Sequence, residues 1–140
     1  MEPGGFEILE HPADIGFRAF GDSLSGLFAN AAVAMLSIAG NPAAAEPRRE
    51  YPLAVESPDR ESLLVDWLGE VLWWFDGRRI AFRDFHVTRF SDGASAAVGR
   101  GEPRDAERHR ARVIVKAVTW HQLKIERRGE VWTAEVYLDI

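Results

Sequence analysis

The chain has 140 residues and no cysteine, so disulfides, thiolate zinc sites and a cysteine nucleophile are excluded. Its length predicts a single domain over residues 1–140, and an apolar fraction of 46% is typical of a globular protein. The net charge is −5, yet residues 99–128 carry nine basic and four acidic side chains. We expect a charged loop at residues 99–112 and a solvated strand face there, because a free-standing nucleic-acid binder is normally basic overall.

The first five residues are acidic and glycine-rich, whereas a secretory leader begins with basic and then apolar residues. No apolar run reaches the roughly 18 residues that a membrane span needs. We therefore expect a cytoplasmic protein that has no membrane partner.

Two short strands are predicted first, at residues 6–10 and 16–20. Apolar residues then recur at helical spacing from Leu24 to Ile38, and Asp22 occupies the expected N-cap position. The helix should end at Gly40, before the alanine- and proline-rich residues 42–49, which we expect to form a mobile connection.

A second helix is predicted after a modest strand at residues 50–56. Ser57 is the expected cap, and Pro58 suits the first helical position because its missing N–H has no helical partner there. One broad apolar stripe runs from Leu63 to Phe75, and the Asp76-Gly77 pair closes the helix.

After Gly77 the apolar period changes from helical spacing to alternation, which is typical of strands. We expect strands near residues 80–87, 94–98 and 113–119, and a hairpin turn at Arg128-Gly129 before the last strand. Two helices with mostly antiparallel strands predict an α+β fold. Both helices should pack on one face of a mostly antiparallel or mixed β-sheet, giving two layers.

Asp14 follows His11 and Pro12 in the turn between the first two strands, where an aspartate commonly caps backbone N–H groups. The last strand buries its even-numbered residues, so Asp139 should point to the opposite face. If the last strand pairs beside the first ones, Asp14, Asp139 and the terminal carboxylate of Ile140 converge. Three anionic groups need a cation or a proton between them, and a hard divalent ion such as calcium accepts such oxygens.

Two further features have open alternatives. His11 and His121 are either ordinary surface residues or metal ligands, and the lack of an HExxH motif disfavours zinc. Lys116 either covers apolar surface with its stem or offers a cation to a phosphate or a partner's carboxylate. The sequence contains no P-loop, no dinucleotide fingerprint and no GxSxG elbow, so no enzymatic motif is present.

Three segments together resemble the archease family. They are HPADIGF at residues 11–17 with GDSL at 21–24, SLLVDWL at 62–68, and KAVTWHQLKIE at 116–126 with YLDI at 137–140. The match spans almost the whole chain in the family's order. Pro12 and Trp120 stand where threonine and tyrosine are usual, and neither position is a proposed ligand.

The resemblance implies a non-catalytic activator of an RtcB-type RNA ligase in tRNA splicing and RNA repair. Such a protein promotes ligase guanylylation and multiple turnover, and it meets tRNA only through the ligase. The resemblance also implies a metal site at Asp14, Asp139 and Ile140, usually filled by calcium, and activating residues that include Lys116 and His121.

Two other functions stay open at this point. One is a metal-dependent phosphoester hydrolase that uses Asp14, His11, His121 and Asp139 around a metal-bound water. The other is a chaperone-like or RNA-binding adaptor that acts through the basic segment.

Overall fold

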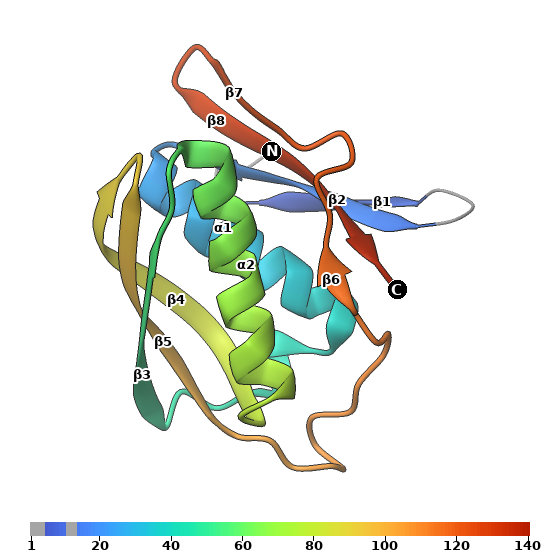
Figure 1. The fold of residues 1–140 in the computed structure, drawn as a ribbon. Coiled ribbons are helices and arrows are strands. Elements are labelled where there is room, and N and C mark those ends of the chain that lie inside the picture. Colours follow the sequence, from blue (N-terminus) through green and yellow to red (C-terminus); the bar gives the residue numbers. More distant parts are fainter. Residues whose placement is uncertain (1–4, 11–13) are drawn as a thin grey trace.

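The computed structural model describes residues 5–10 and 14–140. Within them, two long helices and eight strands in two antiparallel sheets form an α+β fold, which confirms the predicted class (Figure 1). The first helix contacts strands of both sheets, so it lies between them. The strands therefore form two sheets, and the helices pack against both. Which strands belong to which sheet depends on pairing between segments that are distant in the sequence.

The larger sheet contains the first and the last strands of the chain. Its order is β1–β2–β8–β6, and β7 also pairs with β8. The bounds are β1 Phe6–Glu10, β2 Ile15–Gly21, β6 Ala117–Val118, β7 Lys124–Arg128 and β8 Val131–Asp139. The strand expected at residues 113–119 is thus limited to two residues, and it forms one edge of the sheet.

The smaller sheet has the order β3–β5–β4, and all its pairs are antiparallel. Its bounds are β3 Arg49–Glu56, β4 Ile80–Ser91 and β5 Ala94–Pro103. Strand β5 is longer than expected, because it continues through residues 99–103, which were assigned to the charged loop.

The helices are α1 Leu24–Ala39 and α2 Arg60–Asp76, and both predicted caps are wrong by one or two residues. Ser23, not Asp22, accepts the Gly26 N–H, and Asp59, not Ser57, accepts the Ser62 N–H. Ser57 instead donates its hydroxyl to Asp66 at 2.5 Å. Among the described residues, neither helix is long and apolar enough to cross a membrane.

Trp67 joins the layers at the centre of the core. Its ring is fully buried on α2, and its Nε1–H donates to the Phe28 carbonyl of α1 at 2.9 Å. The same ring meets Phe85 of β4 edge-to-face, with 5.6 Å between centroids. One side chain thereby fixes both helices against the smaller sheet.

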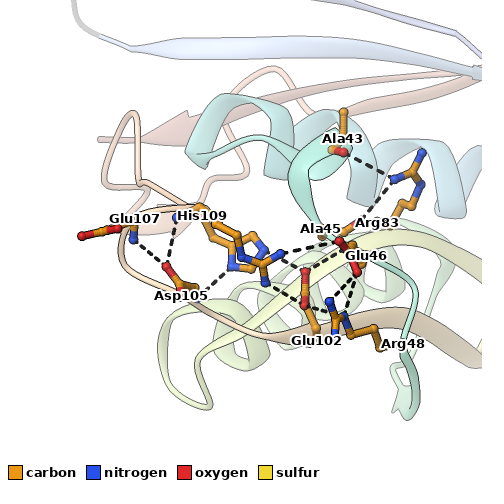
Figure 2. A network of polar contacts seen from close by, with 10 residues as sticks. Ala43, Ala45, Glu46, Arg48, Arg83, Glu102, Asp105, Glu107 and His109 are labelled. Carbon is orange, nitrogen blue, oxygen red and sulfur yellow. Dashed lines mark hydrogen bonds and ion pairs between the residues drawn. The ribbon is translucent and has the colours of Figure 1, made fainter.

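Residues 42–49 and the end of β5 meet at the buried carboxylate of Glu102 (Figure 2). Residues 42–44 form a short 3₁₀ helix, η1 Pro42–Ala44. The Oε2 of Glu102 accepts the Glu46 backbone N–H at 2.8 Å, and its Oε1 accepts from Arg108 at 2.8 Å and lies 3.2 Å from Arg48 Nε. The connection that was expected to be mobile is therefore anchored by a carboxylate.

His109 completes this network from the other side. Its Nδ1 accepts the Asp105 N–H at 2.7 Å, so the proton is on Nε2, which donates to Glu102 at 3.0 Å. The pKa of Glu102 is lowered from 4.5 to about 2, chiefly by the Glu46 N–H and then by Arg108 and His109, while burial acts in the opposite direction. All the oxygen lone pairs face donors, which makes this carboxylate an anchor closed to ligands.

Strands β2 and β8 approach closely at Gly16, which pairs with Tyr137. A Cβ on Gly16 would lie 2.6 Å from the Tyr137 ring carbon Cδ1 and 2.6 Å from the Val136 carbonyl oxygen. Only glycine leaves room for the tyrosine ring at this position, so the glycine of the HPADIGF segment has a packing role.

Replacing Glu102 with glutamine should lower the free energy of unfolding at pH 7 by about 2 kcal/mol, because a hydrogen bond to a charged group is worth about 1.5–3 kcal/mol. Because the folded-state pKa is depressed, the stabilisation is complete above pH 4.5 and disappears as the pH falls towards 2. Urea unfolding across this range would show the difference between the two proteins shrinking in acid. An unchanged difference at pH 7 and pH 3 would contradict the assignment.

Gly16→Ala should lower the free energy of unfolding by about 1–3 kcal/mol, since an added methyl must displace the Tyr137 ring or the β8 backbone. Gly69→Ala is the matched control: a Cβ there meets nothing within 4 Å, and alanine should stabilise α2 by about 1 kcal/mol. Chemical denaturation measures both changes. Equal stabilities for the two variants would show that packing of the Tyr137 ring does not require glycine at position 16.

Candidate functional site

The residues predicted to form a site meet at the end of the larger sheet where β2 begins and β8 ends. The β2–β8 pairing opposes Ile15 to Leu138, so Asp14 and Asp139 follow as the next opposed positions. Opposed residues of an antiparallel pair project from the same face. Leu138 is buried and Ile15 packs on the core, so the two aspartates belong to the outward face, away from α1.

Strand β6 brings Lys116 to the same place. Ala117 opposes Asp139, and the Lys116 backbone N–H donates to the Asp139 carbonyl at 2.7 Å. Lys116 and Asp139 are both exposed, and Ile140 is 43% exposed just beyond the strand. The start of β2, the edge strand and the last residue of the sequence therefore lie at the same end of the larger sheet, as Figure 1 shows for their backbones.

His121 contacts Tyr137, the residue two positions before Asp139 on β8. The two rings meet edge-to-face with 5.9 Å between centroids, and His121 is exposed while Tyr137 is buried. Thr119 stabilises the backbone turn at residues 121–122. Its Oγ1 accepts the His121 N–H at 3.2 Å and donates to the Tyr137 carbonyl at 3.1 Å. We call Asp14, Lys116, His121, Asp139 and Ile140 the C-terminal cluster.

The electrostatics of the outward face are set by carboxylates around one arginine. Arg18 donates to Glu7 and, at 2.6 Å, to Glu135, and these bonds raise the pKa of its guanidinium. Burial raises the pKa of the Tyr137 hydroxyl, and the charges of Glu135 and Asp14 raise it further. Asp14 is thus within electrostatic range of Tyr137, while Arg18 is already shared between two other acids.

The acidic groups of the C-terminal cluster, those of Asp14, Asp139 and the Ile140 carboxylate, offer oxygen ligands, which suit a hard divalent cation. Within residues 5–10 and 14–140, neither Asp14 nor Asp139 has an ion-pair partner, and no group of three histidine, aspartate or glutamate side chains is placed so that it could hold a metal ion. An ion there would have to take further oxygens from the Ile140 carboxylate, backbone carbonyls and water. His11, the other histidine considered, lies outside the described residues.

The basic segment does not form one patch in the described structure. Arg100 pairs with Asp84 at 2.5 Å, and Arg104 lies 3.5 Å from Asp76. Arg108 binds Glu102, while Lys124 and Arg128 both approach Glu126. Five of the nine cations of residues 99–128 thereby face carboxylates, which removes much of the basis for a nucleic-acid surface.

Sequence reasoning missed Tyr137, whose ring contacts His121 and whose hydroxyl pKa is raised in part by the charge of Asp14. The available signal was strand alternation: Tyr137 is two residues before Asp139, so it shares the outward face with that aspartate. The contact between Tyr137 and Gly16 depends on which strand pairs with β8. The alternation of apolar residues in β8 alone cannot predict its neighbouring strand.

The chain is similar to known proteins along almost its whole length. Residues 6–140 match the model of the Archease protein family. Protein archease of Methanosarcina acetivorans is 40% identical over 139 residues, covering 96% of this chain and 95% of that protein. Protein archease of Pyrococcus furiosus is 38% identical over 139 residues, covering 96% and 98%.

Two solved structures have the same fold. The solution structure of protein 1598 of Methanobacterium thermoautotrophicum is 35% identical, with a TM-score of 0.79 over 98% of this chain and 99% of that chain. The crystal structure of an archease from Thermotoga maritima, described as a possible chaperone, is 21% identical with a TM-score of 0.66 over 94% of each chain, and this likeness concerns the fold alone. From the family match and the identity of these relatives along nearly the whole chain, we conclude that this chain belongs to the archease family.

Proposed function

We propose that this archease is a non-catalytic activator of an RtcB-type RNA ligase, which promotes ligase guanylylation and multiple turnover in tRNA splicing and RNA repair. The observation that carries the proposal is the β2–β8–β6 pairing, which leaves Asp14 and Asp139 on the outward face at one end of the sheet and bonds the Lys116 backbone to Asp139. Membership of the archease family supports it. The sequence also contains none of the nucleotide or nucleophile motifs considered above.

The outward face is suited to contact with a protein. Helix α1 packs on the opposite face of this sheet, and Lys116, His121 and Asp139 are exposed. Exposed charges of both signs beside an aromatic pair can fix the orientation of a partner and steer its approach. In the proposal, Lys116 and His121 touch the ligase, and tRNA is met only through the ligase, in the cytoplasm.

A divalent ion, Ca²⁺, is part of the proposal. Asp14 and Asp139 would hold it together with the Ile140 carboxylate, and the oxygen-only donor set fits a hard cation. When bound, the ion supplies positive charge that offsets the mutual repulsion of these acids. In the proposal, Asp14 at the start of β2 is held beside the end of the last strand by the bound ion, in the arrangement that the ligase recognises.

The direct test is a guanylylation assay with a matched RtcB-type ligase, Mn²⁺ and labelled GTP. We expect the chain to raise the rate of label transfer to the ligase at least tenfold and to allow several RNA-joining cycles per ligase molecule. The chain alone should take up no label and join no RNA. Equal rates with and without the chain would contradict the proposed function.

Asp14→Asn keeps the side-chain shape but removes the charge, so it should weaken Ca²⁺ binding at least tenfold by calorimetry and reduce the stimulation of guanylylation. Lys116→Gln should keep the Ca²⁺ affinity and lose stimulation. Asp92→Asn is the matched control, because Asp92 is an exposed acid in the β4–β5 turn of the other sheet. If Asp14→Asn binds Ca²⁺ like the control variant, the metal assignment is wrong.

A further inference from the structure

A groove of about 710 Å³ runs between α2 and the edge strand β6. Val65, Leu72 and Trp73 form the apolar part of its helix wall, and residues 115–118 form the opposite wall. Strand β6 is the last strand in the sheet order, so no further strand of the described chain pairs with its outer side. An edge strand beside an apolar groove can accept an extended segment of another chain.

One exposed apolar side chain, Trp73, lines this groove, and two others flank its strand wall in the sequence. Ile114 and Trp120 bracket β6 and are 73% and 57% exposed, and Trp73 on the helix wall is 53% exposed. Ile140 lies beyond the end of the neighbouring strand. These are four of the six large apolar side chains that are exposed in the described part of the chain. Large apolar side chains left exposed beside a groove are typical of a protein-binding surface.

Gly69 leaves the helix wall open. It lies four residues after Val65 and three before Leu72, so the three share one side of α2. A Cβ at Gly69 would meet nothing within 4 Å. Glycine in the middle of a helix lowers helix stability relative to alanine, and here no close packing within the chain requires it. The space that it leaves is available to an occupant.

The charges of the groove differ between its two walls. Asp66 and Asp76 belong to the helix wall and are exposed. Asp66 accepts the Ser57 hydroxyl, and Asp76 lies 3.5 Å from one Arg104 nitrogen. The strand wall presents Lys116. A basic side chain of the occupant is therefore favoured towards α2, and an acidic one towards β6.

We propose that this groove binds an extended segment of the partner protein, which pairs along β6, inserts an apolar side chain against Leu72 and Trp73, and presents a basic side chain to the Asp66 and Asp76 wall. The identity of the partner, the RtcB-type ligase, rests on the proposed function. Lys116 belongs to both the groove and the C-terminal cluster, so one partner can cover the two surfaces. Backbone pairing supplies affinity and the side-chain pockets supply selectivity.

The test fills the groove without disturbing the fold. Gly69→Leu should weaken binding of the ligase at least tenfold in a surface-binding assay, with Ca²⁺ affinity and thermal stability retained. Gly69→Ala, which adds one methyl, should stay within threefold of the wild type. His86→Leu is the matched control, because it adds the same side chain at an exposed position on β4 of the other sheet.

Hydrogen exchange gives a second readout, in which the amides of residues 115–118 should gain protection when the ligase binds. Equal ligase affinities for the wild type and Gly69→Leu, or unchanged exchange at residues 115–118, would overturn the groove proposal. Loss of self-association in Gly69→Leu with unchanged ligase binding would also overturn it, by making a second copy of the chain the occupant. The activator function fails separately, through equal guanylylation rates with and without the wild-type chain.

Discussion

The antiparallel pairing of β2 with β8 decides which side chains share the candidate site. It joins segments separated by more than a hundred residues, from Ile15 opposite Leu138 to Gly21 opposite Trp132. Side chains alternate between the two faces of a strand, so a slip of one residue would turn the aspartates inward and the apolar residues outward. The C-terminal cluster therefore depends on strand register more than on any contact among its own members.

Packing holds that register on both faces of the sheet. On the inner face, Phe17, Ala134 and Val136 are fully buried, so a slip would expose them. On the outer face, the Tyr137 ring occupies the space that Gly16 leaves, and Arg18 links Glu7 of β1 to Glu135 of β8. Burial of these side chains thus supplies the free energy that fixes the β2–β8 register. The register holds Asp14 and Asp139 in place without any attraction between the two aspartates.

The periodicity of apolar residues predicted the helices and strands that are determined by their own local sequence. The two helices and the last strand were correct in kind, because each buries one continuous stripe of its own residues. The caps were misplaced because neighbouring residues, Asp22 with Ser23 and Ser57 with Asp59, have similar capping ability. The division into two sheets could not be predicted, since it depends on which distant strands meet, and β6 is shorter than its alternating pattern indicated.

For the site, alternation on β8 and the position of Asp14 predicted that Asp14 and Asp139 converge. The register pairs their neighbours, Ile15 and Leu138, and the shared cation stays a prediction. The role of Tyr137 and the α2–β6 groove were missed, because both arise between elements far apart in sequence. The ion pairs of the basic segment were also missed: Asp84 and Asp76 belong to β4 and to the end of α2, and Glu102, inside the segment, is paired only once the chain folds.

The central claim is that Asp14 and Asp139 act on one cation. A double-mutant cycle on Ca²⁺ affinity, with Asp14→Asn, Asp139→Asn and the double variant, measures this by calorimetry. We predict that the two losses are non-additive by at least about 1 kcal/mol, as expected for groups that share a partner. Losses that add to within about 0.3–0.5 kcal/mol, or no loss in either single variant, would contradict the account.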